Sequence, residues 1–504
     1  MLIDVQYNEM KEKLIVSHTD EKGGIKIRQY NWSNPTKFDS CLPDDPDAHP
    51  IYKSWDGKNI KLIPTNRPDR YAIYDFIDSL PKEERDIIHA YHEPKIYFID
   101  IETEIIDGFP DAETAPTQVL SISIVYDNKC ILLGLKDLTQ QQIESIRKKT
   151  NKHLEKLGIE FEIKYIKYAD EFDMMFTFFN KMIPTMPCIS GWFVYDYDWK
   201  YLINRAKKIT KTVNSKLYTI DIRVTSPTRR MYKEWTPPDK AESPELPMHR
   251  LIIDYKLLYE KNDTSVKVKE SSSLDFVSEK ILGIKKIKFD GSLKKLYDED
   301  FETFMFYNAV DSILVQLIHN KMNYISIIYG ISTLAELKAS DILSHSRETW
   351  GSLVITEGVL RKKFKDIDNV ILFKDTSKSN SKVPFVGGWV KEPSIGMNRW
   401  AVCYDFASLY PTTQRQFFIS PENYLGDYKD GMIYSSDKPI PFDSTIHVRC
   451  VNDAVFLKRK SPTILMLEEV FGGRRQYKNK MMAAKFEYDD TMREIKRLEK
   501  ELGM

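Results

Sequence analysis

Residues 95–102 read Lys-Ile-Tyr-Phe-Ile-Asp-Ile-Glu, an apolar run that ends in two carboxylates two positions apart. A run of branched and aromatic residues of this length predicts a β-strand. Side chains alternate between the faces of a strand, so Asp100 and Glu102 point one way, whereas Ile99 and Ile101 point toward the expected core. Two adjacent carboxylates repel each other unless a cation lies between them, and their hard oxygen atoms suit Mg²⁺ or Mn²⁺. Such pairs are also common without a metal, so the motif alone leaves both interpretations open.

The hundred residues after this strand alternate strand-like and helix-like runs, which is typical of an α/β domain. Residues 1–94 are instead expected to be β-rich, with one helix around residues 71–80 that Pro81 closes. We therefore predict a multidomain protein of α/β and α+β class. The expected domains are 1–94 (completed by about 330–375), 95–329 with a proline-rich insertion at about 221–250, 376–464, and a partial domain at 465–504. The polar segment 377–382 is the predicted boundary.

Composition excludes several classes of protein. The chain has 504 residues and a formal net charge of zero. Its aromatic share of 12% and hydrophobic share of 42% exclude a disordered chain. We see neither an apolar run long enough to span a membrane nor a secretory signal, so we expect a soluble cytoplasmic protein. The five cysteines show no C-x-x-C pair, which argues against a disulfide framework or a zinc site and favours a reducing compartment.

Local charge departs from the zero total. Residues 200–233 hold ten Lys or Arg and one acid, whereas residues 100–113 hold six acids and no base. A basic tract beside an acidic cluster is what a nuclease needs, because one holds phosphates and the other holds metal ions. Two differently charged, solvated faces are the alternative.

Two further acids lie downstream of the first pair. Asp198 ends the stretch Gly-Trp-Phe-Val-Tyr-Asp-Tyr-Asp at residues 191–198, at an expected strand-to-helix turn. Tyr307 and Asp311 are four residues apart in a helical stretch, and that spacing places both on one face. The alternatives are a helix N-cap for Asp198 and a surface pair for Tyr307 and Asp311.

These three segments, F-I-D-I-E, G-W-x-x-x-x-Y-D and Y-x-x-x-D, resemble in the same order the three exonuclease motifs of family B (alpha-like) DNA polymerases. The resemblance implies an RNase H-like 3′→5′ exonuclease domain at residues 95–329. In that domain two Mg²⁺ or Mn²⁺ ions would be held by four acids, and Tyr307 would orient the attacking water; the acids are Asp100, Glu102, Asp198 and Asp311. Phe193 stands where the family has Asn, which implies a weaker DNA contact or weaker proofreading.

A second resemblance begins 200 residues later. Residues 402–411 read Val-Cys-Tyr-Asp-Phe-Ala-Ser-Leu-Tyr-Pro and resemble the first palm motif of the same family, D-x-x-S-L-Y-P. We expect Asp405 to end a strand. The resemblance implies that Asp405 ligates the metal ions of synthesis, and that Tyr410, with Ser408 and Leu409, binds the incoming nucleotide and selects deoxyribose. The run RQFFISPEN at 415–423 extends the resemblance to tailed-phage polymerases, although the preceding Thr-Thr-Gln departs from it.

Two more segments carry weaker signals. Gly387 and Gly388 resemble the junction motif between the exonuclease and polymerase parts, where paired glycines permit a template phosphate to approach the backbone. Arg474 and Lys478 open a long helix and match the fingers positions that grip the triphosphate. The alternatives are a simple turn and a solvated charged helix. The resemblance makes residues 376–464 a partial palm and residues 465–504 the first part of the fingers.

Two motifs of the family do not occur in the sequence: K-x-x-x-N-S-x-Y-G and the palm D-T-D. We therefore expect no DNA synthesis from this chain alone. The favoured hypothesis is the N-terminal subunit of a split phage replicative polymerase in an infected host cell; the alternative origin is a shortened chain. Its expected partners are primer-template DNA, dNTP, a C-terminal polymerase subunit, and a sliding clamp bound through that subunit. Competing hypotheses are a stand-alone 3′→5′ exonuclease and a non-catalytic DNA-binding regulator.

Overall fold

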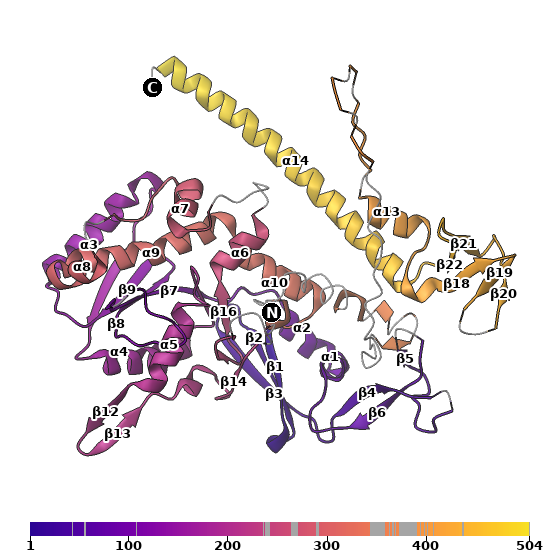
Figure 1. Ribbon diagram of the computed structural model, residues 1–504, viewed down its shortest axis with the longest axis horizontal. Coiled ribbons are helices and arrows are strands. Elements are labelled where there is room, and N and C mark those ends of the chain that lie inside the picture. The colour runs from indigo at the N-terminus through magenta and orange to yellow at the C-terminus, as the bar shows by residue number, and fades with distance from the viewer. Residues whose placement is uncertain are drawn as a thin grey trace. The chain divides into compact units, whose positions relative to one another are not determined.

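The computed structural model forms two compact units, which are described separately (Figure 1). Unit 1 comprises Met1–Pro35 and Ile73–Gly358, and unit 2 comprises Thr36–Ala72 and Val359–Met504. The structure describes residues 1–502 apart from 43, 55–56, 107, 235, 237–241, 264–270, 289–291, 343–357, 362, 365–366, 368, 372–390, 394, 398, 401, 407 and 436–437. The predicted boundary at 377–382 lies outside the described residues, and the predicted domain limits stay a prediction.

A six-stranded mixed sheet forms the centre of unit 1, in the order β10-β9-β8-β7-β11-β16. β8 runs antiparallel to β7 and β9, whereas β10–β9, β7–β11 and β11–β16 are parallel pairs. The strands are β7 (Ile96–Thr103), β8 (Val119–Tyr126), β9 (Lys129–Gly134), β10 (Glu162–Lys167), β11 (Cys188–Gly191) and β16 (Leu251–Asp254). This mixed arrangement of strands and helices confirms the α/β character that the alternating pattern predicts.

Helices cover both faces of this sheet (Figure 1). Ile99 and Ile101 of β7 pack on the face covered by α4 (Glu171–Thr177) and α5 (Asp198–Lys208), as predicted. Phe98 packs on the other face, against α9 (Phe301–Met322), with α3 (Gln140–His153) in the same core. Because side chains alternate along a strand, Asp100 and Glu102 lie on the α9 face.

The remaining elements of unit 1 lie before and after this sheet in the sequence. β1 (Leu2–Asn8), β2 (Lys13–Thr19) and β3 (Ile25–Asn31) form an antiparallel sheet. The helix α1 (Arg70–Ser79) confirms the predicted one, but α2 (Lys82–His89) follows where Pro81 was expected to close the segment. Pro81 precedes the first turn, which holds Glu83 and Glu84, and this composition favours a helix start. The later helices are α6 (Tyr255–Asn262), α7 (Leu274–Leu282), α8 (Leu293–Glu299), α10 (Tyr324–Ala335) and α11 (Ala339–Ile342).

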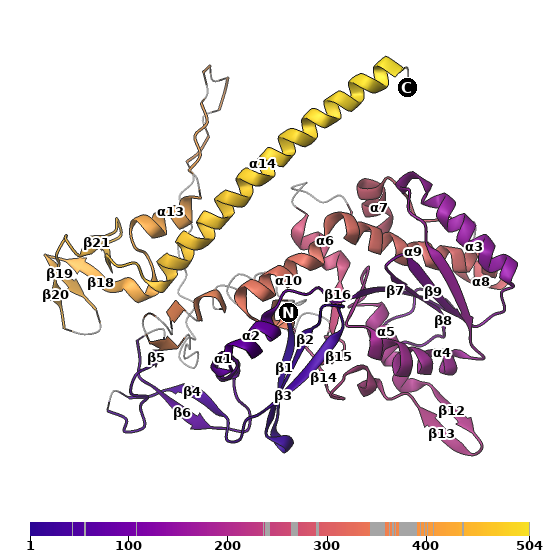
Figure 2. The same ribbon diagram turned by 180° about the vertical axis from the view of Figure 1, so that it is seen from behind.

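The predicted insertion at 221–250 contains one short strand pairing, β14 (Met231–Tyr232) with β15 (Leu246–Pro247). A longer hairpin precedes the insertion, formed by β12 (Thr210–Val213) and β13 (Lys216–Thr219), and it projects beyond α5 (Figure 2).

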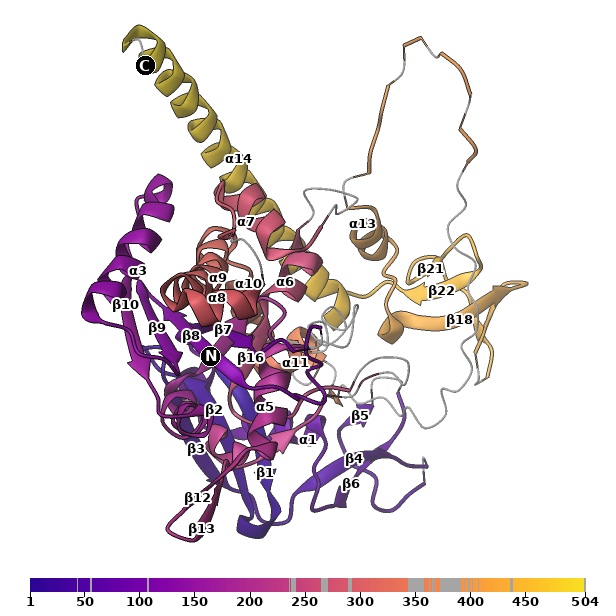
Figure 3. The ribbon, with the colours of Figure 1, turned by 60° about the vertical axis from the view of Figure 1, so that its left-hand side comes forward.

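Unit 2 contains a five-stranded antiparallel sheet in the order β20-β19-β18-β22-β21. Its strands are β18 (Tyr424–Lys429), β19 (Met432–Tyr434), β20 (Ile440–Pro441), β21 (His447–Arg449) and β22 (Ala454–Leu457). Two small pairings join β4 (Thr36–Ser40) to β6 (Ile60–Pro64) and β5 (Lys53–Ser54) to β17 (Val370–Ile371). The unit also contains α13 (Leu409–Gln416) and the long rod α14 (Pro462–Leu502), which confirms a C-terminal helix (Figure 3). The helix begins at Pro462, however, so Arg474 and Lys478 lie within it and do not open it as expected.

The strand expected to end at Asp405 is not formed. Residues 402–406 have no regular secondary structure and are exposed, with Val402 at 71% and Phe406 at 76% exposure. An apolar run becomes a stable strand only where a neighbouring strand takes up its backbone hydrogen bonds, and no described strand pairs with this one. Within the described residues, no helix is long and apolar enough to cross a membrane.

Candidate metal centre

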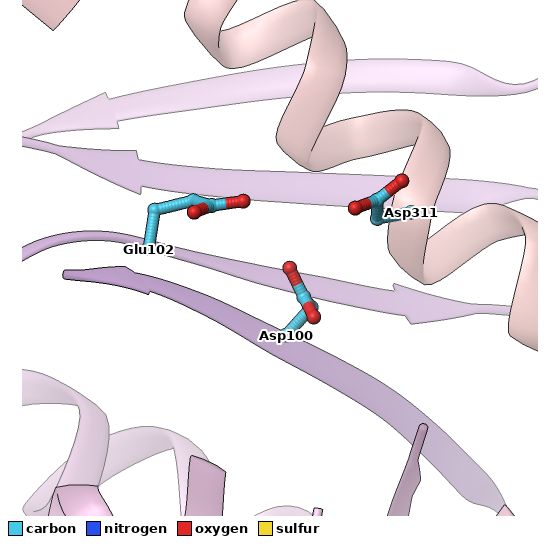
Figure 4. Close-up of side chains that lie close together, drawn as sticks. All are labelled: Asp100, Glu102 and Asp311. Atoms are coloured by element: carbon cyan, nitrogen blue, oxygen red, sulfur yellow. The ribbon is translucent and has the colours of Figure 1, made fainter. Parts of the chain in front are cut away.

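Three carboxylates from two distant segments meet on the α9 face of the sheet (Figure 4). Asp100 and Glu102 come from β7 and Asp311 from α9, and one oxygen atom of each lies within 4.8 Å of the others. Glu102 is 9% exposed and Asp311 is 3% exposed, so the group is largely withdrawn from water. The structure therefore brings together three of the four acids named from the sequence.

A group of hydrogen-bonded polar side chains, here called the polar seam, joins α9 to β8 beside these acids. Its members are Ser121, Ser123, Asn308 and Ser312. The Asn308 side-chain amide donates to Asp100 Oδ2 at 2.8 Å, and Ser121 Oγ donates to Asn308 Oδ1 at 3.1 Å. Ser123 and Ser312 are also hydrogen-bonded to each other. The two β8 serines lie opposite Glu102 and Asp100 in the strand register. The sequence reasoning missed this seam, although its signal is present: serine recurs with period two in β8.

Asp198, the fourth acid, is the first residue of α5 and is only 4% exposed. Its Oδ1 accepts a hydrogen bond from the backbone N–H of Ile101 at 3.0 Å, which ties it to the strand between Asp100 and Glu102. The N-cap of α5 is Tyr197, with no side-chain capping bond, so the capping alternative for Asp198 is wrong. Asp198 thus lies beside the three-acid group without belonging to it.

A lysine that the sequence reasoning missed completes the site. Lys286 Nζ lies 2.6 Å from Asp311 Oδ2 and 5.2 Å from the centre of the Tyr307 ring. Asp311 Oδ1 is buried and has no hydrogen-bond partner among the described residues. Lys286 lies in an irregular segment between α7 and α8, and nothing in its local sequence distinguishes it from the neighbouring lysines.

Burial and mutual repulsion shift the protonation of the acids. Burial, with the charges of Asp198 and Glu102, raises the pKa of Asp100 well above its usual range. Burial and the nearby Asp311 raise the pKa of Glu102 to about 8, and burial raises the pKa of Asp198 to about 7. Burial also raises the pKa of Asp311, although the Lys286 ammonium opposes this shift.

The pKa values of the two neighbouring side chains, Lys286 and Tyr307, are raised as well. Burial lowers the pKa of Lys286, but the nearby Asp311, Tyr307 and Asp100 together outweigh that effect and the net pKa is raised, so Lys286 is a cation. Burial raises the pKa of the Tyr307 phenol, which is therefore protonated and able to donate a hydrogen bond.

The residues present fit a divalent cation. Every candidate ligand is a carboxylate oxygen, which is the donor that Mg²⁺ and Mn²⁺ prefer. The raised pKa values indicate that Lys286 only partly offsets the burial and mutual repulsion of these acids, and Asp311 Oδ1 is a buried acceptor with no partner among the described residues. A divalent cation would offset the repulsion and give Asp311 Oδ1 a partner, and its binding would displace protons from the carboxylates.

The basic tract at 200–233 is less available for phosphates than its composition suggests. Seven of its ten cations form ion pairs with acids from several segments, including Lys200 with Glu113 and Arg205 with Glu171. Those acids lie largely outside the tract, so a count over 200–233 overstates the free positive charge.

The residues of unit 2 that are expected to take part in DNA synthesis do not form a buried group like that of the acids in unit 1. Asp405 is exposed, Tyr410 is 82% exposed, and Leu409 begins α13. Arg474 Nη1 donates to Ser408 Oγ at 3.2 Å, which brings the first palm motif beside α14. Lys478 lies one turn later on the same helix. Gly387 and Gly388 lie outside the described residues.

Comparison with known proteins shows what the chain is similar to. Residues 72–276 match the family described as DNA polymerase family B, exonuclease domain. This segment includes β7 and Asp198, so the part of the chain that holds the first acids is similar to the exonuclease domain of these polymerases.

Two curated relatives extend the match. The chain is 24% identical to the DNA-directed DNA polymerase of Escherichia phage RB69 over 416 residues, which cover 79% of this chain and 44% of that protein. It is 27% identical to the DNA-directed DNA polymerase of Enterobacteria phage T4, with 93% of this chain and 53% of that protein covered. Over these spans the chain is similar to phage DNA-directed DNA polymerases, and it spans about half the length of these relatives.

Proposed function

We propose that this chain removes nucleotides from the 3′ end of DNA, as the proofreading part of a phage replicative DNA polymerase. The observation that carries the proposal is the largely buried group of Asp100, Glu102 and Asp311. Asp198 is hydrogen-bonded to the strand between the first two. Hydrolysis of a phosphodiester needs concentrated positive charge, and this acid group is suited to hold it. The active compartment would be the cytoplasm of the infected host cell.

The four acids would hold two Mg²⁺ or Mn²⁺ ions. Bound there, such ions stabilise the charge that develops on the phosphate and make water a stronger nucleophile. Asp311 would offer its unpartnered Oδ1, while Lys286 neutralises Oδ2. Tyr307 lies beside Lys286 and keeps its proton, so its hydroxyl would donate a hydrogen bond that orients the water or the phosphate. Asn308 would keep Asp100 turned toward the group.

The test is degradation of a single-stranded oligonucleotide labelled at its 5′ end, in Mg²⁺, by the chain and by the double variant Asp100→Ala/Glu102→Ala. We expect a ladder of 3′-shortened products from the chain and none from the variant. Circular dichroism of the variant checks that the fold survives. Equal Mg²⁺-dependent digestion by both proteins would disprove the assignment.

We further propose that residues 376–464 are a partial palm and residues 465–504 the first part of the fingers, alongside the other domains predicted above. Asp405 would bind a metal ion of synthesis, and the nucleotide and template contacts would be made by Ser408, Leu409, Tyr410, Arg474, Lys478, Gly387 and Gly388. The bond between Arg474 and Ser408 supports this grouping, because it joins the two segments that would meet the incoming dNTP.

A C-terminal polymerase chain is the proposed partner for synthesis on primer-template DNA, and it would also provide any contact with a sliding clamp. An exposed apolar stripe on α14 supports such a partner. The stripe recurs every seven residues, which is the pattern of a helix that packs along another helix. Its most exposed members are Tyr477 (70%), Met481 (59%), Tyr488 (64%) and Leu502 (73%), and Ile495 and Leu498 continue it.

Primer extension tests this partner. A separate chain that carries the two absent motifs is mixed with this one, and synthesis is compared with each chain alone. We expect extension from the mixture, and a loss of it when Met481 and Ile495 are replaced by Lys. No gain on mixing would contradict the partner.

A stand-alone exonuclease is the second candidate. The observation that favours it is the contrast between the assembled acid group and the exposed, unstructured Asp405 segment. Vigorous 3′→5′ digestion, with no extension in the presence of the second chain, would select this candidate.

A further inference from the structure

Phe193 lies in the loop that connects β11 to α5, at the end of the sheet where the acid group lies. β11 runs parallel to β7 and pairs Ser190 with Phe98, so the chain leaves β11 beside the acids of β7. The approach is close, since a side-chain carbon on Gly191 would lie 2.6 Å from the Ile99 carbonyl oxygen. The loop then returns to place Asp198 on the Ile101 N–H. Phe193 is therefore held at the same end of the sheet as the acids.

Its backbone conformation is unusual for a phenylalanine. Phe193 has φ = +70°, a left-handed conformation that residues with a β-carbon rarely adopt. The Asp254 carboxylate enforces it, because that group accepts hydrogen bonds from the backbone N–H groups of Phe193 (3.3 Å) and Tyr195 (3.1 Å). Asp254 is itself only 1% exposed and caps α6. The direction of the Phe193 side chain is thus set by a rigid, buried anchor.

That side chain points outward, unlike the residues that follow it. Phe193 is 39% exposed, whereas Val194 is fully buried and Tyr195 is 5% exposed. Lys256 Nζ lies 4.4 Å from the centre of the Phe193 ring. An exposed ring that carries a cation is an arrangement that single-stranded nucleic acid recognises, because a base stacks on the ring and the ammonium attracts the phosphate.

We propose that Phe193 and Lys256 form a stacking platform for a base at or next to the 3′ terminus of the DNA strand. The exposed ring offers a base stacking and no hydrogen bond, so the platform does not depend on which base is bound. The platform holds the strand end over the acid group and lowers KM more than it changes kcat. This inference rests on the proposed exonuclease function.

Binding of a short single strand with 2-aminopurine at its last or second-last position tests the platform, with Ca²⁺ in place of Mg²⁺ to stop cleavage. We expect Phe193→Ala to weaken binding roughly 5- to 150-fold, equal to ~1–3 kcal/mol of lost stacking, and to relieve the quenching of 2-aminopurine. Phe193→Trp should retain both properties. Tyr218→Ala is the matched control, because Tyr218 is also 39% exposed with a lysine, Lys216, 5.3 Å from its ring centre.

An abasic substrate separates stacking from a structural effect. Without the base at the quenched position, the chain and Phe193→Ala should bind equally. Equal binding to the intact strand, no detectable binding, or an equally large loss on the abasic strand would overturn the platform. Hydrolysis in Mg²⁺ is measured separately. Cleavage without ring-dependent binding refutes the platform alone, whereas ring-dependent binding without cleavage refutes the exonuclease function alone.

Discussion

The acid group of unit 1 and the segment of unit 2 that resembles the first palm motif were both evident in the sequence. They differ in how closely the structure brings their side chains together. Asp100, Glu102 and Asp311 are brought within 4.8 Å by a strand and a helix that pack against each other. Asp405 lies in an exposed segment without regular structure, and Tyr410 is 82% exposed. The palm motif is the more specific pattern of the two, so motif strength does not measure how complete a site is. Completeness depends on whether the neighbouring elements are present to position the side chains.

The largest expected effect is a difference in exonuclease activity between variants of these two sites. Asp311→Ala should lower 3′→5′ digestion of single-stranded DNA by at least about 10²-fold, by analogy with the loss of one preorganised stabilising group. Asp405→Ala should leave that activity unchanged, because its carboxylate belongs to the other unit. Both rates are measured on one 5′-labelled strand at saturating Mg²⁺. Equal losses in the two variants would show that the acid groups do not act independently.

A second prediction concerns the burial on which the assembled site depends. His319 lies two helical turns beyond Asp311 on α9 and packs against the rings of Phe98 and Tyr255. Burial lowers its pKa to about 4, against a small opposing effect of Glu93. The unfolded chain therefore binds more protons between pH 4 and 6.5, so the free energy of unfolding should fall as pH falls through this window, by up to ~3 kcal/mol.

His319→Phe provides the matched comparison, since it keeps the aromatic packing but cannot titrate. Denaturant midpoints at pH 4.5, 5.5, 7 and 8 should diverge for the two proteins on the acid side, with the variant the more stable. Parallel midpoints across that range would contradict a buried neutral histidine at the β7–α9 contact.

Lys286 gives the third prediction. Lys286→Met would leave Asp311 without its cation, and loss of a group that orients a ligand costs about 10- to 100-fold in metal affinity or activity. Lys286→Arg should recover part of the loss because it restores the charge. Mn²⁺ binding and the Mg²⁺ dependence of digestion measure the effect. Tighter Mn²⁺ binding by Lys286→Met would instead show that the lysine competes with the metal.

The parts that the sequence predicted well are those encoded locally. Period-two alternation placed Asp100 and Glu102 on one face of β7, and helical spacing placed Tyr307 near Asp311. Lys286 was missed because its meeting with Asp311 is a tertiary contact from an irregular segment. The strand expected at Asp405 failed because a strand needs partners that a local pattern does not supply. The basic tract was overestimated because its counter-ions, such as Glu171, come from elsewhere in the chain.

The smallest expected effect tests the strained residue at the edge of the assembled site. Phe193→Asn should relieve part of the left-handed strain, worth ~1 kcal/mol, because Asn tolerates positive φ better than Phe. Loss of the Lys256 contact at an exposed ring offsets this by about 0.5 kcal/mol. A net gain of roughly 0.5 kcal/mol in the free energy of unfolding remains, which corresponds to an increase of about 1–2 °C in the unfolding midpoint.

Phe193→Ala is the control for this prediction: it loses the ring and keeps the strain, so it should be less stable than Phe193→Asn. If Asn proves no more stable than Ala, the loop is not strained, and the rigid anchoring of Phe193 by Asp254 loses its support. A more stable Asn variant that binds DNA less tightly would show that this site retains strain for contact with its substrate.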